Sequence, residues 1–231
     1  MRLRNKNEDN DMTSKLLFLC TSVTALFVST PAHPCVAQED LDTRVREFLD
    51  EHRRSWRDMN VPMSDGQALY DIIVENGYTQ ALEIGTSTGH SAIWIAWALS
   101  TTGGKLITIE IDERRYRQAL EYFEHAGLSD YIDARLADAH ELVPALSGPF
   151  DFVFLDADKD WYTQYFRDVL PKLQVGGCFT AHNVSQRGGR RGRGSGGTSQ
   201  FVEELTATPN LETEFVTGGG GLSVSYKRRS P

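Results

Sequence analysis

The sequence predicts an α/β fold in which helices cover both faces of a mostly parallel sheet of seven strands. From about residue 80, short apolar segments alternate with segments of helical periodicity, which is typical of successive β-α-β units. The chain has 231 residues, 40% of them hydrophobic and 24% charged, as in an ordinary single globular domain. Its formal net charge of −8 excludes a basic surface over the whole fold, so no nucleic-acid partner is expected.

Each element of this fold has its own signal along the chain. Helical spacing of apolar residues predicts two helices ahead of the sheet, at 39–58 and 64–76. Apolar segments rich in β-branched and aromatic residues then predict five parallel strands, at 81–85, 105–110, 131–137, 151–156 and 177–183. Helices are expected between these strands, beginning near Gly89, Asp112, Asp138 and Trp161.

The chain after the fifth strand predicts a loop, a helix and a hairpin. A Gly- and Arg-rich loop at 185–197 precedes helical spacing at 198–206. Segments 211–217 and 221–226 flank the glycines at 218–221, which predicts an antiparallel hairpin. The loop is interpreted as a clamp for an anionic substrate, as a solvated linker or as a short RNA-binding segment. Its arginines are Arg187, Arg190, Arg191 and Arg193.

Residues 1–37 have the pattern of a secretory signal peptide. An apolar, uncharged segment at 16–28 follows Lys15 and is itself followed by small residues and Pro31. Its length covers roughly 20 Å of a hydrocarbon core of roughly 30 Å, so no stable membrane span is expected. Cleavage is expected after Ala37, which places the mature chain in the periplasm or outside the cell. The alternative is a buried N-terminal helix in a cytoplasmic protein.

A glycine-containing turn follows the first predicted strand and opens a helix, a position where backbone N–H groups of α/β sheets meet ligands. Gly85 and Gly89 give the spacing G-x-x-x-G. Dinucleotide sites more usually show G-x-G-x-x-G, and Ser87 stands where the second of those glycines would be. The spacing therefore disfavours NAD and FAD. The alternative is a tight turn without a ligand.

Polar residues at the ends of the next two strands complete a nucleoside pattern. Glu110 ends the second strand, where a carboxylate accepts hydrogen bonds from ribose hydroxyls. Asp138 and Ala139 follow the third strand, where a carboxylate and a backbone N–H can bind an adenine edge. Asp138 is equally placed to cap the following helix, and the two roles are compatible. The residues at three successive strand ends are thus predicted to contact one nucleoside.

Residues 61–184 resemble the cation-dependent O-methyltransferases that use S-adenosylmethionine, the caffeoyl-CoA and catechol O-methyltransferase group. The segments that carry the resemblance are MSDGQAL at 63–69, EIGTSTGHS at 83–91, TIEID at 108–112, FDFVFLDADKDWY at 150–162 and GGCFTAHNV at 176–184. The resemblance implies a Rossmann-like class I methyltransferase fold, a methyltransferase domain at 38–231 and a small hydroxylated, catechol-like acceptor. It also implies a homodimer.

The resemblance implies a division of this domain and a set of cofactor contacts. The N-terminal helices occupy 38–78, the cofactor-binding core 79–184, and the C-terminal helix and hairpin 198–231. The residues implied to contact S-adenosylmethionine are Val61, Glu83, Gly85, Thr86, Ser91, Glu110, Asp138, Ala139, Asp156 and Asp158.

Asp156 ends the fourth strand, while His182 and Asn183 end the fifth, and these ends face one crevice in an open parallel sheet. Members of the family hold a divalent cation with Asp, Asp and Asn. Here His182 replaces the second Asp, and its imidazole suits Zn, Mn or Fe better than Mg or Ca. Three alternatives stay open: a metal site of Asp156, His182 and Asn183, a metal-free site with His182 as base, and a structural histidine.

Lys159 matches the family position of a proposed general base, so Asp156, Lys159 and His182 are the catalytic candidates. An amine is protonated at neutral pH and must be desolvated or face a cation to act as a base; the alternative is a surface lysine. Trp161 and Tyr162 form either an aromatic wall for a planar substrate or part of the core. The competing functions are a non-catalytic nucleoside- or RNA-binding module and methylation of another atom or of a protein.

Overall fold

The computed structural model describes residues 34–54, 56, 59–185 and 195–229. Residues 1–33 of the expected signal peptide, the loop residues 186–194 and all four of the loop arginines therefore lie outside the described residues. In the part of the chain that is described, none of the helices combines the length and the apolar character needed to cross a membrane.

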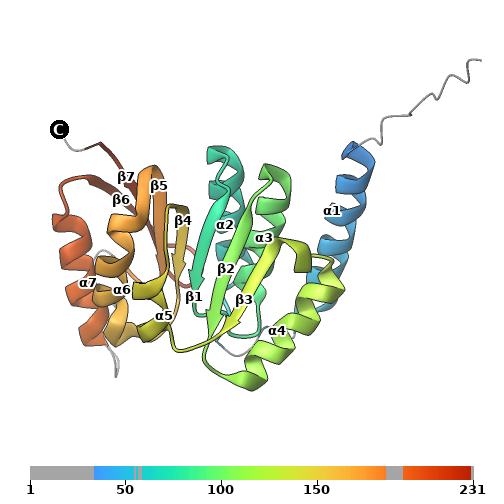
Figure 1. The fold of residues 1–231 in the computed structure, drawn as a ribbon, viewed down its shortest axis with the longest axis horizontal. Coiled ribbons are helices and arrows are strands. Elements are labelled where there is room, and N and C mark those ends of the chain that lie inside the picture. Colours follow the sequence, from blue (N-terminus) through green and yellow to red (C-terminus); the bar gives the residue numbers. More distant parts are fainter. Residues whose placement is uncertain (1–33, 55, 57–58, 186–194, 230–231) are drawn as a thin grey trace, which may run out of the picture. The chain divides into compact units, whose positions relative to one another are not determined.

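Seven strands form one sheet in the order β3-β2-β1-β4-β5-β7-β6 (Figure 1). Strands β1 to β5 pair in parallel, and β7 runs against both β5 and β6. The predicted α/β fold, with its mostly parallel sheet and C-terminal hairpin, is confirmed. The strands are β1 (Gln80–Ile84), β2 (Lys105–Glu110), β3 (Ile132–Leu136), β4 (Phe150–Leu155), β5 (Leu173–His182), β6 (Leu211–Val216) and β7 (Leu222–Lys227).

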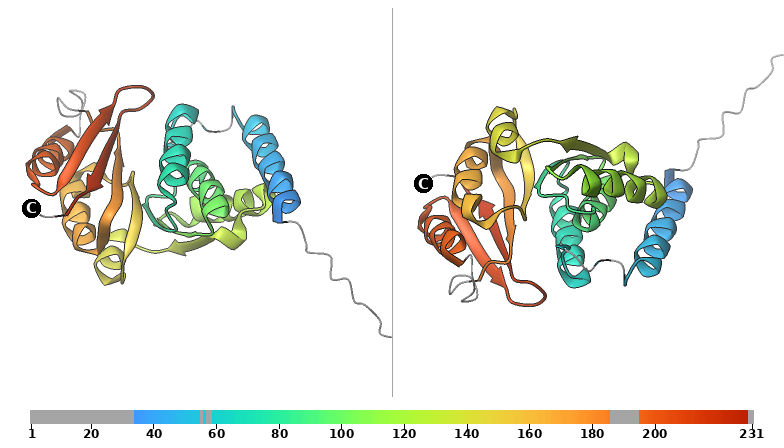
Figure 2. Two further views of the ribbon diagram at one scale, coloured as in Figure 1. Left: turned by 90° about the horizontal axis from the view of Figure 1, so that it is seen from above. Right: turned by 90° about the horizontal axis from the view of Figure 1, so that it is seen from below.

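Helices cover both faces of the sheet, as predicted (Figure 2). Successive side chains of a strand point to opposite faces, so in β1 Ala81 packs in one apolar cluster while Leu82 and Ile84 pack in the other. The first cluster includes side chains of α1 (Pro34–Glu51), α2 (Met63–Asn76), α3 (His90–Thr102) and α4 (Glu113–Ala126). The second includes side chains of α5 (Ala139–Ala145), α6 (Tyr162–Val169) and α7 (Ser195–Ala207).

The largest differences from the predicted element bounds are in the first helix and in β5. The first helix ends at Glu51 instead of residue 58. Past its end, the ring of Trp56 stacks on His90 at 4.5 Å between centroids and meets Tyr122 edge-on. Strand β5 begins at Leu173 instead of residue 177. Gly176 and Gly177 lie inside the strand, near the point where its register with β4 shifts.

The sheet topology places the ends of β1, β2, β4 and β5 along one edge. Gly85 follows β1 with φ of 101°, and a Cβ there would lie 2.5 Å from the backbone oxygen of Asp156. Only glycine allows this approach of the first turn to the end of β4.

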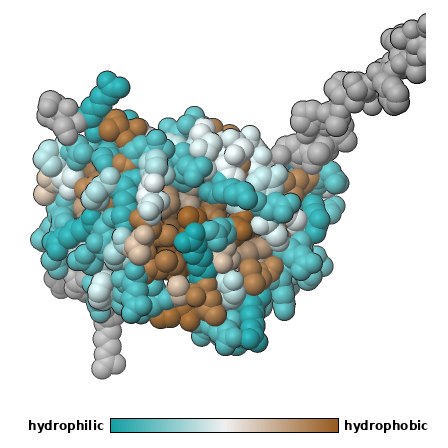
Figure 3. Space-filling view, viewed as in Figure 1, coloured by the Kyte–Doolittle hydropathy of each residue, from teal (hydrophilic) through white to brown (hydrophobic). Residues whose placement is uncertain are grey.

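Figure 3 shows hydrophobic residues gathered in the middle of the face seen in Figure 1, in front of β1 and β2, with hydrophilic residues around them.

Candidate active site

A cavity of about 410 Å³ lies at this edge, between the ends of β1, β2 and β4 and the beginning of α5. The carboxylates on its wall come from separate strand ends, as expected for a parallel sheet. Six of the ten residues implied to contact the cofactor line it: Gly85, Glu110, Asp138, Ala139, Asp156 and Asp158. The cavity therefore assembles most of the side chains expected at a nucleoside site.

Glu110 is held in one orientation before any ligand arrives. Its Oε2 accepts a hydrogen bond from the backbone N–H of Ser87 at 2.7 Å, and its Oε1 accepts from the N–H groups of Ile111 and Asp112 at 3.1 and 2.9 Å. The side chain is 6% exposed. Ser87 adopts a φ of 51°, unusual for a residue other than glycine, and this backbone conformation accompanies the contact of its N–H with Glu110.

Asp138 caps a helix at the wall of the cavity. Its carboxylate caps α5 by accepting from the N–H of His140 at 2.9 Å, and it also lines the cavity. The His140 ring stacks on Trp161 at 3.7 Å between centroids. His140 Nε2 lies 3.2 Å from Asp158 Oδ2, and the Tyr165 hydroxyl donates to Asp158 Oδ1 at 3.1 Å. This side of the cavity is thus lined by polar and aromatic groups.

The remaining four residues implied to contact the cofactor do not line the cavity and are buried: Val61, Glu83, Thr86 and Ser91. Glu83 is fully buried and accepts a hydrogen bond from Thr108, whose hydroxyl also meets that of Thr86 at 2.5 Å. Burial raises the pKa of Glu83 from 4.5 to about 8, although hydrogen bonds from Ser91 and Thr108 oppose the change. Val61 is held through its carbonyl, 2.9 Å from His90 Nδ1.

The residues present fit S-adenosylmethionine. The cavity has the size of a small-molecule site, and its wall presents the Glu110 carboxylate, which backbone N–H groups hold in place. Two buried side-chain oxygens of this region, Glu83 Oε1 and Ser87 Oγ, have no hydrogen-bond partner among the described residues. Such atoms are rare in native proteins and here indicate where a polar ligand completes the structure.

The sequence prediction missed several wall residues and one buried acid. Ser87, His140 and Tyr165 line the cavity, and each of the first two neighbours a predicted residue in the chain. The buried acid is Asp65, the third residue of α2, which is 4% exposed and meets the end of β5. Its segment carried part of the family resemblance, but nothing in the chain places it beside His182, 117 positions later.

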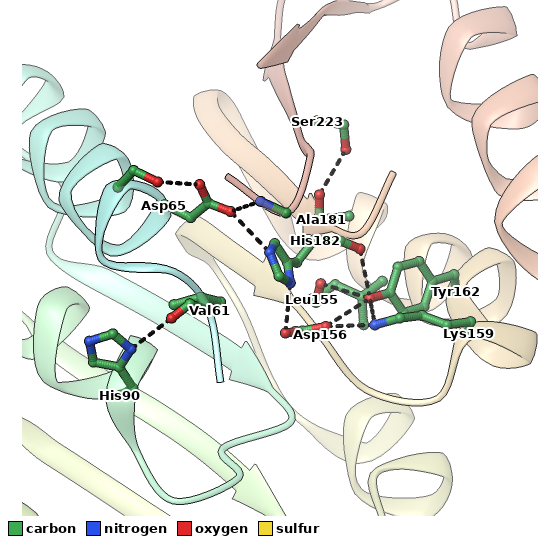
Figure 4. A network of polar contacts seen from close by, with 12 residues as sticks. Val61, Asp65, His90, Leu155, Asp156, Lys159, Tyr162, Ala181, His182 and Ser223 are labelled. Carbon is green, nitrogen blue, oxygen red and sulfur yellow. Dashed lines mark hydrogen bonds and ion pairs between the residues drawn. The ribbon is translucent and has the colours of Figure 1, made fainter. Parts of the chain in front are cut away.

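Asp156 joins the cofactor cavity to the polar network drawn in Figure 4. Its Oδ1 accepts from Lys159 Nζ at 2.6 Å, and its Oδ2 lies 3.0 Å from His182 Nδ1. The other ring nitrogen of the histidine, Nε2, lies 3.0 Å from Asp65 Oδ2. A histidine thus bridges two carboxylates that come from α2 and from the end of β4.

The expected metal-ligand set of Asp156, His182 and Asn183 is not assembled. Each ring nitrogen of His182 faces a carboxylate oxygen, so neither directs a lone pair toward an ion shared with Asp156, and Asn183 is exposed. Across the described residues, no three His, Cys, Asp or Glu side chains converge on a point where a metal ion could bind. The residues present therefore do not fit a divalent cation held as the family holds it.

The geometry disfavours His182 as general base, one of the alternatives that the sequence left open. The residue is 4% exposed, and its two nitrogens are already engaged, so no nitrogen is available to an acceptor hydroxyl. Burial alone would lower its pKa, but the hydrogen bonds and charges of Asp156 and Asp65 outweigh burial and raise it. For Asp156, burial is likewise outweighed by His182 and Lys159, which lower the pKa of its carboxyl.

The side chain of Lys159 is more exposed than those of Asp156 and His182 in this network. Its Nζ donates to Asp156 Oδ1, to the Tyr162 hydroxyl at 2.7 Å and to the carbonyl of Ala157 at 3.3 Å. All three ammonium protons thus have acceptors, while 28% of the side chain stays exposed. Tyr162 is fully buried and packs in the core, whereas Trp161 is 38% exposed and stacks on His140, a residue of the cavity wall.

Known proteins match both the sequence and the structure. The O-methyltransferase family model matches residues 35–225. Caffeoyl-CoA O-methyltransferase 1 of Eucalyptus globulus is 32% identical over 196 residues, which cover 78% of this chain and 78% of that protein. Catechol O-methyltransferase of Niastella koreensis is 40% identical over 111 residues, 46% of this chain, and the match spans half the length of that relative.

A solved structure agrees with this relationship. The O-methyltransferase of Bacillus cereus in complex with S-adenosylhomocysteine superimposes with a TM-score of 0.70 at 26% identity, covering 84% of this chain and 97% of that one. The cavity at the strand ends lies where the sequence predicted a nucleoside site. The chain belongs to the O-methyltransferase family, as an S-adenosylmethionine-dependent enzyme of the caffeoyl-CoA and catechol O-methyltransferase type.

Proposed function

We propose that the enzyme methylates a hydroxyl group of a small, catechol-like aromatic acceptor bound beside Asp156 and Lys159. The observation that carries the proposal is the Lys159–Asp156 pair at 2.6 Å, where a cavity carboxylate is joined to a partly exposed cation. An ammonium group attracts the oxygen of a phenol as it loses its proton, because it stabilises the developing negative charge. The relatives named for catechol and caffeoyl-CoA support an aromatic acceptor.

On the cofactor side, we assign the ribose to Glu110 and the adenine edge to Asp138 and Ala139. When bound, S-adenosylmethionine would supply the methyl group: the bond from sulfur to the methyl carbon would break as the bond to the acceptor oxygen forms, S-adenosylhomocysteine would leave, and the hydroxyl proton would pass to water. The protein binds and orients: the backbone fixes Glu110, and Asp156 holds Lys159 at the acceptor side. Holding the reacting atoms close together supplies much of the acceleration in such a displacement.

Methyl transfer from isotopically labelled S-adenosylmethionine to catechol and to caffeoyl-CoA tests the proposal. We expect label in an ether-linked methyl group of the acceptor, with one S-adenosylhomocysteine formed per methyl transferred. Binding of the cofactor without transfer to any hydroxylated acceptor would favour the non-catalytic nucleoside-binding alternative. Label on nitrogen, sulfur or a protein side chain would assign the enzyme to another methyl acceptor.

The variant Glu110→Ala separates cofactor binding from transfer. Loss of a hydrogen-bonding carboxylate should weaken S-adenosylhomocysteine binding by about 1.5 to 3 kcal/mol in titration calorimetry. Glu113→Ala is the matched control, because Glu113 is an exposed acid at the start of α4 whose side chain pairs with Arg117. Equal affinities of the two variants would remove Glu110 from the cofactor site.

We also propose that residues 1–37 direct export and are then removed, which is supported by the short apolar segment at 16–28. Cleavage after Ala37 would take four residues from the beginning of α1 and leave its core residues Val45 and Phe48 in place. Mass spectrometry of protein from its native source should show Gln38 as the first residue. An intact mass beginning at Met1 or Met12 in the cytosolic fraction would contradict export.

The family resemblance further supports a homodimer, which light scattering of the purified chain would establish or exclude.

A further inference from the structure

The charges around Asp156 balance without a divalent ion. In the family pattern, two Asp carboxylates and an Asn amide surround a cation of charge +2. Here the carboxylates are Asp156 and Asp65, and the groups that face them are His182 and Lys159. A carboxylate accepts hydrogen bonds, so a histidine between two carboxylates is satisfied when both of its ring nitrogens carry protons. In that state, one imidazolium and one ammonium neutralise the two acids.

The Asp65 carboxylate accepts hydrogen bonds from separate parts of the fold. Its Oδ2 accepts from the backbone N–H of Gly220 at 2.8 Å in addition to facing His182, and its Oδ1 accepts from the Ser64 hydroxyl at 3.1 Å. It also lies in the first turn of α2, where the helix dipole favours negative charge. The carboxylate therefore has its hydrogen bonds supplied by α2, by β5 and by the turn between β6 and β7.

The glycine turn at 218–221 closes over the contact between Asp65 and His182. A Cβ on Gly219 would collide with Asp65 Oδ1, and a Cβ on Gly220 would collide with His182 Nε2. A Cβ on Gly218 would meet nothing within 4 Å. The two middle glycines are thus needed for the backbone to lie on the two side chains, which leaves Asp65 and His182 each 4% exposed.

We propose that His182 takes the place of the family's divalent cation: it donates from both ring nitrogens to Asp156 and Asp65, under the glycine turn, and the enzyme needs no added metal ion. Asp65 and His182 are positioning residues that act through Asp156, which in turn holds Lys159 toward the acceptor. Only the activity measurement of this proposal rests on the proposed function, because that measurement needs an acceptor. Its metal-binding and spectroscopic measurements stand apart from any acceptor.

Metal binding is tested on chelator-treated, desalted wild-type protein by calorimetry and by thermal unfolding with Mg²⁺, Mn²⁺ and Zn²⁺. We expect no saturable heat and no rise of the unfolding midpoint with any of the three ions. His182→Asp should behave oppositely, because it leaves three carboxylates without the bridging cation, and its midpoint should rise with Mn²⁺. Saturable binding to the wild type that is lost in Asp156→Asn would overturn the proposal.

Imidazole nitrogen NMR of the wild-type protein tests the bridge directly. The His182 signals, assigned by their absence in His182→Asn, should show protons on both ring nitrogens at neutral pH. A signal with one unprotonated nitrogen would overturn the proposal, since that nitrogen would have a lone pair for a metal.

Two alanine substitutions in the glycine turn give a matched pair. Gly220→Ala should displace the turn, expose the contact between Asp65 and His182 and change the imidazole signals, whereas Gly218→Ala should leave them unchanged. With catechol as acceptor, Gly220→Ala should lower kcat by about tenfold or more with a smaller effect on KM for S-adenosylmethionine. Chelator should change the wild-type rate by less than about twofold. Restoration of a chelator-inactivated wild type by a divalent ion would also overturn the proposal.

Discussion

Replacing Asp156 with asparagine is expected to reduce methyl transfer by about 100-fold or more, because it removes the charge that holds Lys159 and His182 in place. The amide keeps the size of the side chain but has one acceptor oxygen in place of two. It would also place an N–H group opposite a hydrogen-bond donor. Stability should fall as well, by about 3 kcal/mol, since two cationic groups lose their buried partner.

The measurement is kcat/KM with catechol as acceptor, together with chemical denaturation monitored by circular dichroism. Asp160→Asn is the control, because Asp160 is an exposed acid in the same loop. It should behave as wild type in both experiments. An Asp156→Asn enzyme with wild-type activity and stability would show that the network of Figure 4 has no part in transfer.

Glu83→Gln is expected to stabilise the ligand-free enzyme at alkaline pH. In the folded chain the pKa of Glu83 is raised by burial from 4.5 to about 8. Between these pH values the unfolded chain binds fewer protons at this residue than the folded chain, so the stability of the wild type falls as pH rises. Glutamine does not titrate, and each pKa unit corresponds to about 1.4 kcal/mol. Rearrangement of the protein around the charged carboxylate reduces its cost. The expected increase in the free energy of unfolding of Glu83→Gln is therefore roughly 2 to 4 kcal/mol above pH 8.

Urea denaturation of both proteins from pH 4 to pH 9 checks this difference. The two stability curves should meet near pH 4, separate through the interval between pH 4.5 and about 8, and run parallel above it. Curves that stay parallel throughout would show that Glu83 is ionised in the fold. In the same samples, unchanged affinity for S-adenosylmethionine in Glu83→Gln would make Glu83 a buried structural acid and remove it from the cofactor contacts.

The sequence predicted the fold almost completely because its signals are local. Strand β2 was predicted with its observed bounds, and the other strands within a few residues, since apolar runs and glycine turns are read from neighbouring positions. The bounds that failed were set by distant partners. The first helix ends early where Trp56 packs on His90, 34 positions later in the chain, and β5 begins early where glycines sit within a paired strand.

The cofactor side of the site was predictable for the same reason. Gly85, Glu110, Asp138 and Asp156 each end or follow a strand, and parallel strands bring such ends to one edge whatever the rest of the chain does. The same pattern does not predict how deeply each side chain is buried. Glu83 and Ser91 belong to the same motif, but neither lines the cavity, and Glu83 is fully buried.

The sequence by itself determined a parallel α/β sheet, a nucleoside site at its strand ends and membership of a methyltransferase family. Only the tertiary structure decided what His182 does. The sequence alone indicated that His182 ends the fifth strand and that it replaces the second Asp of the family. Whether an imidazole binds a metal, takes a proton or bridges two acids depends on what faces its nitrogens. Here those groups are Asp65 from α2, Asp156 from β4 and the glycine turn, which only the folded chain brings together.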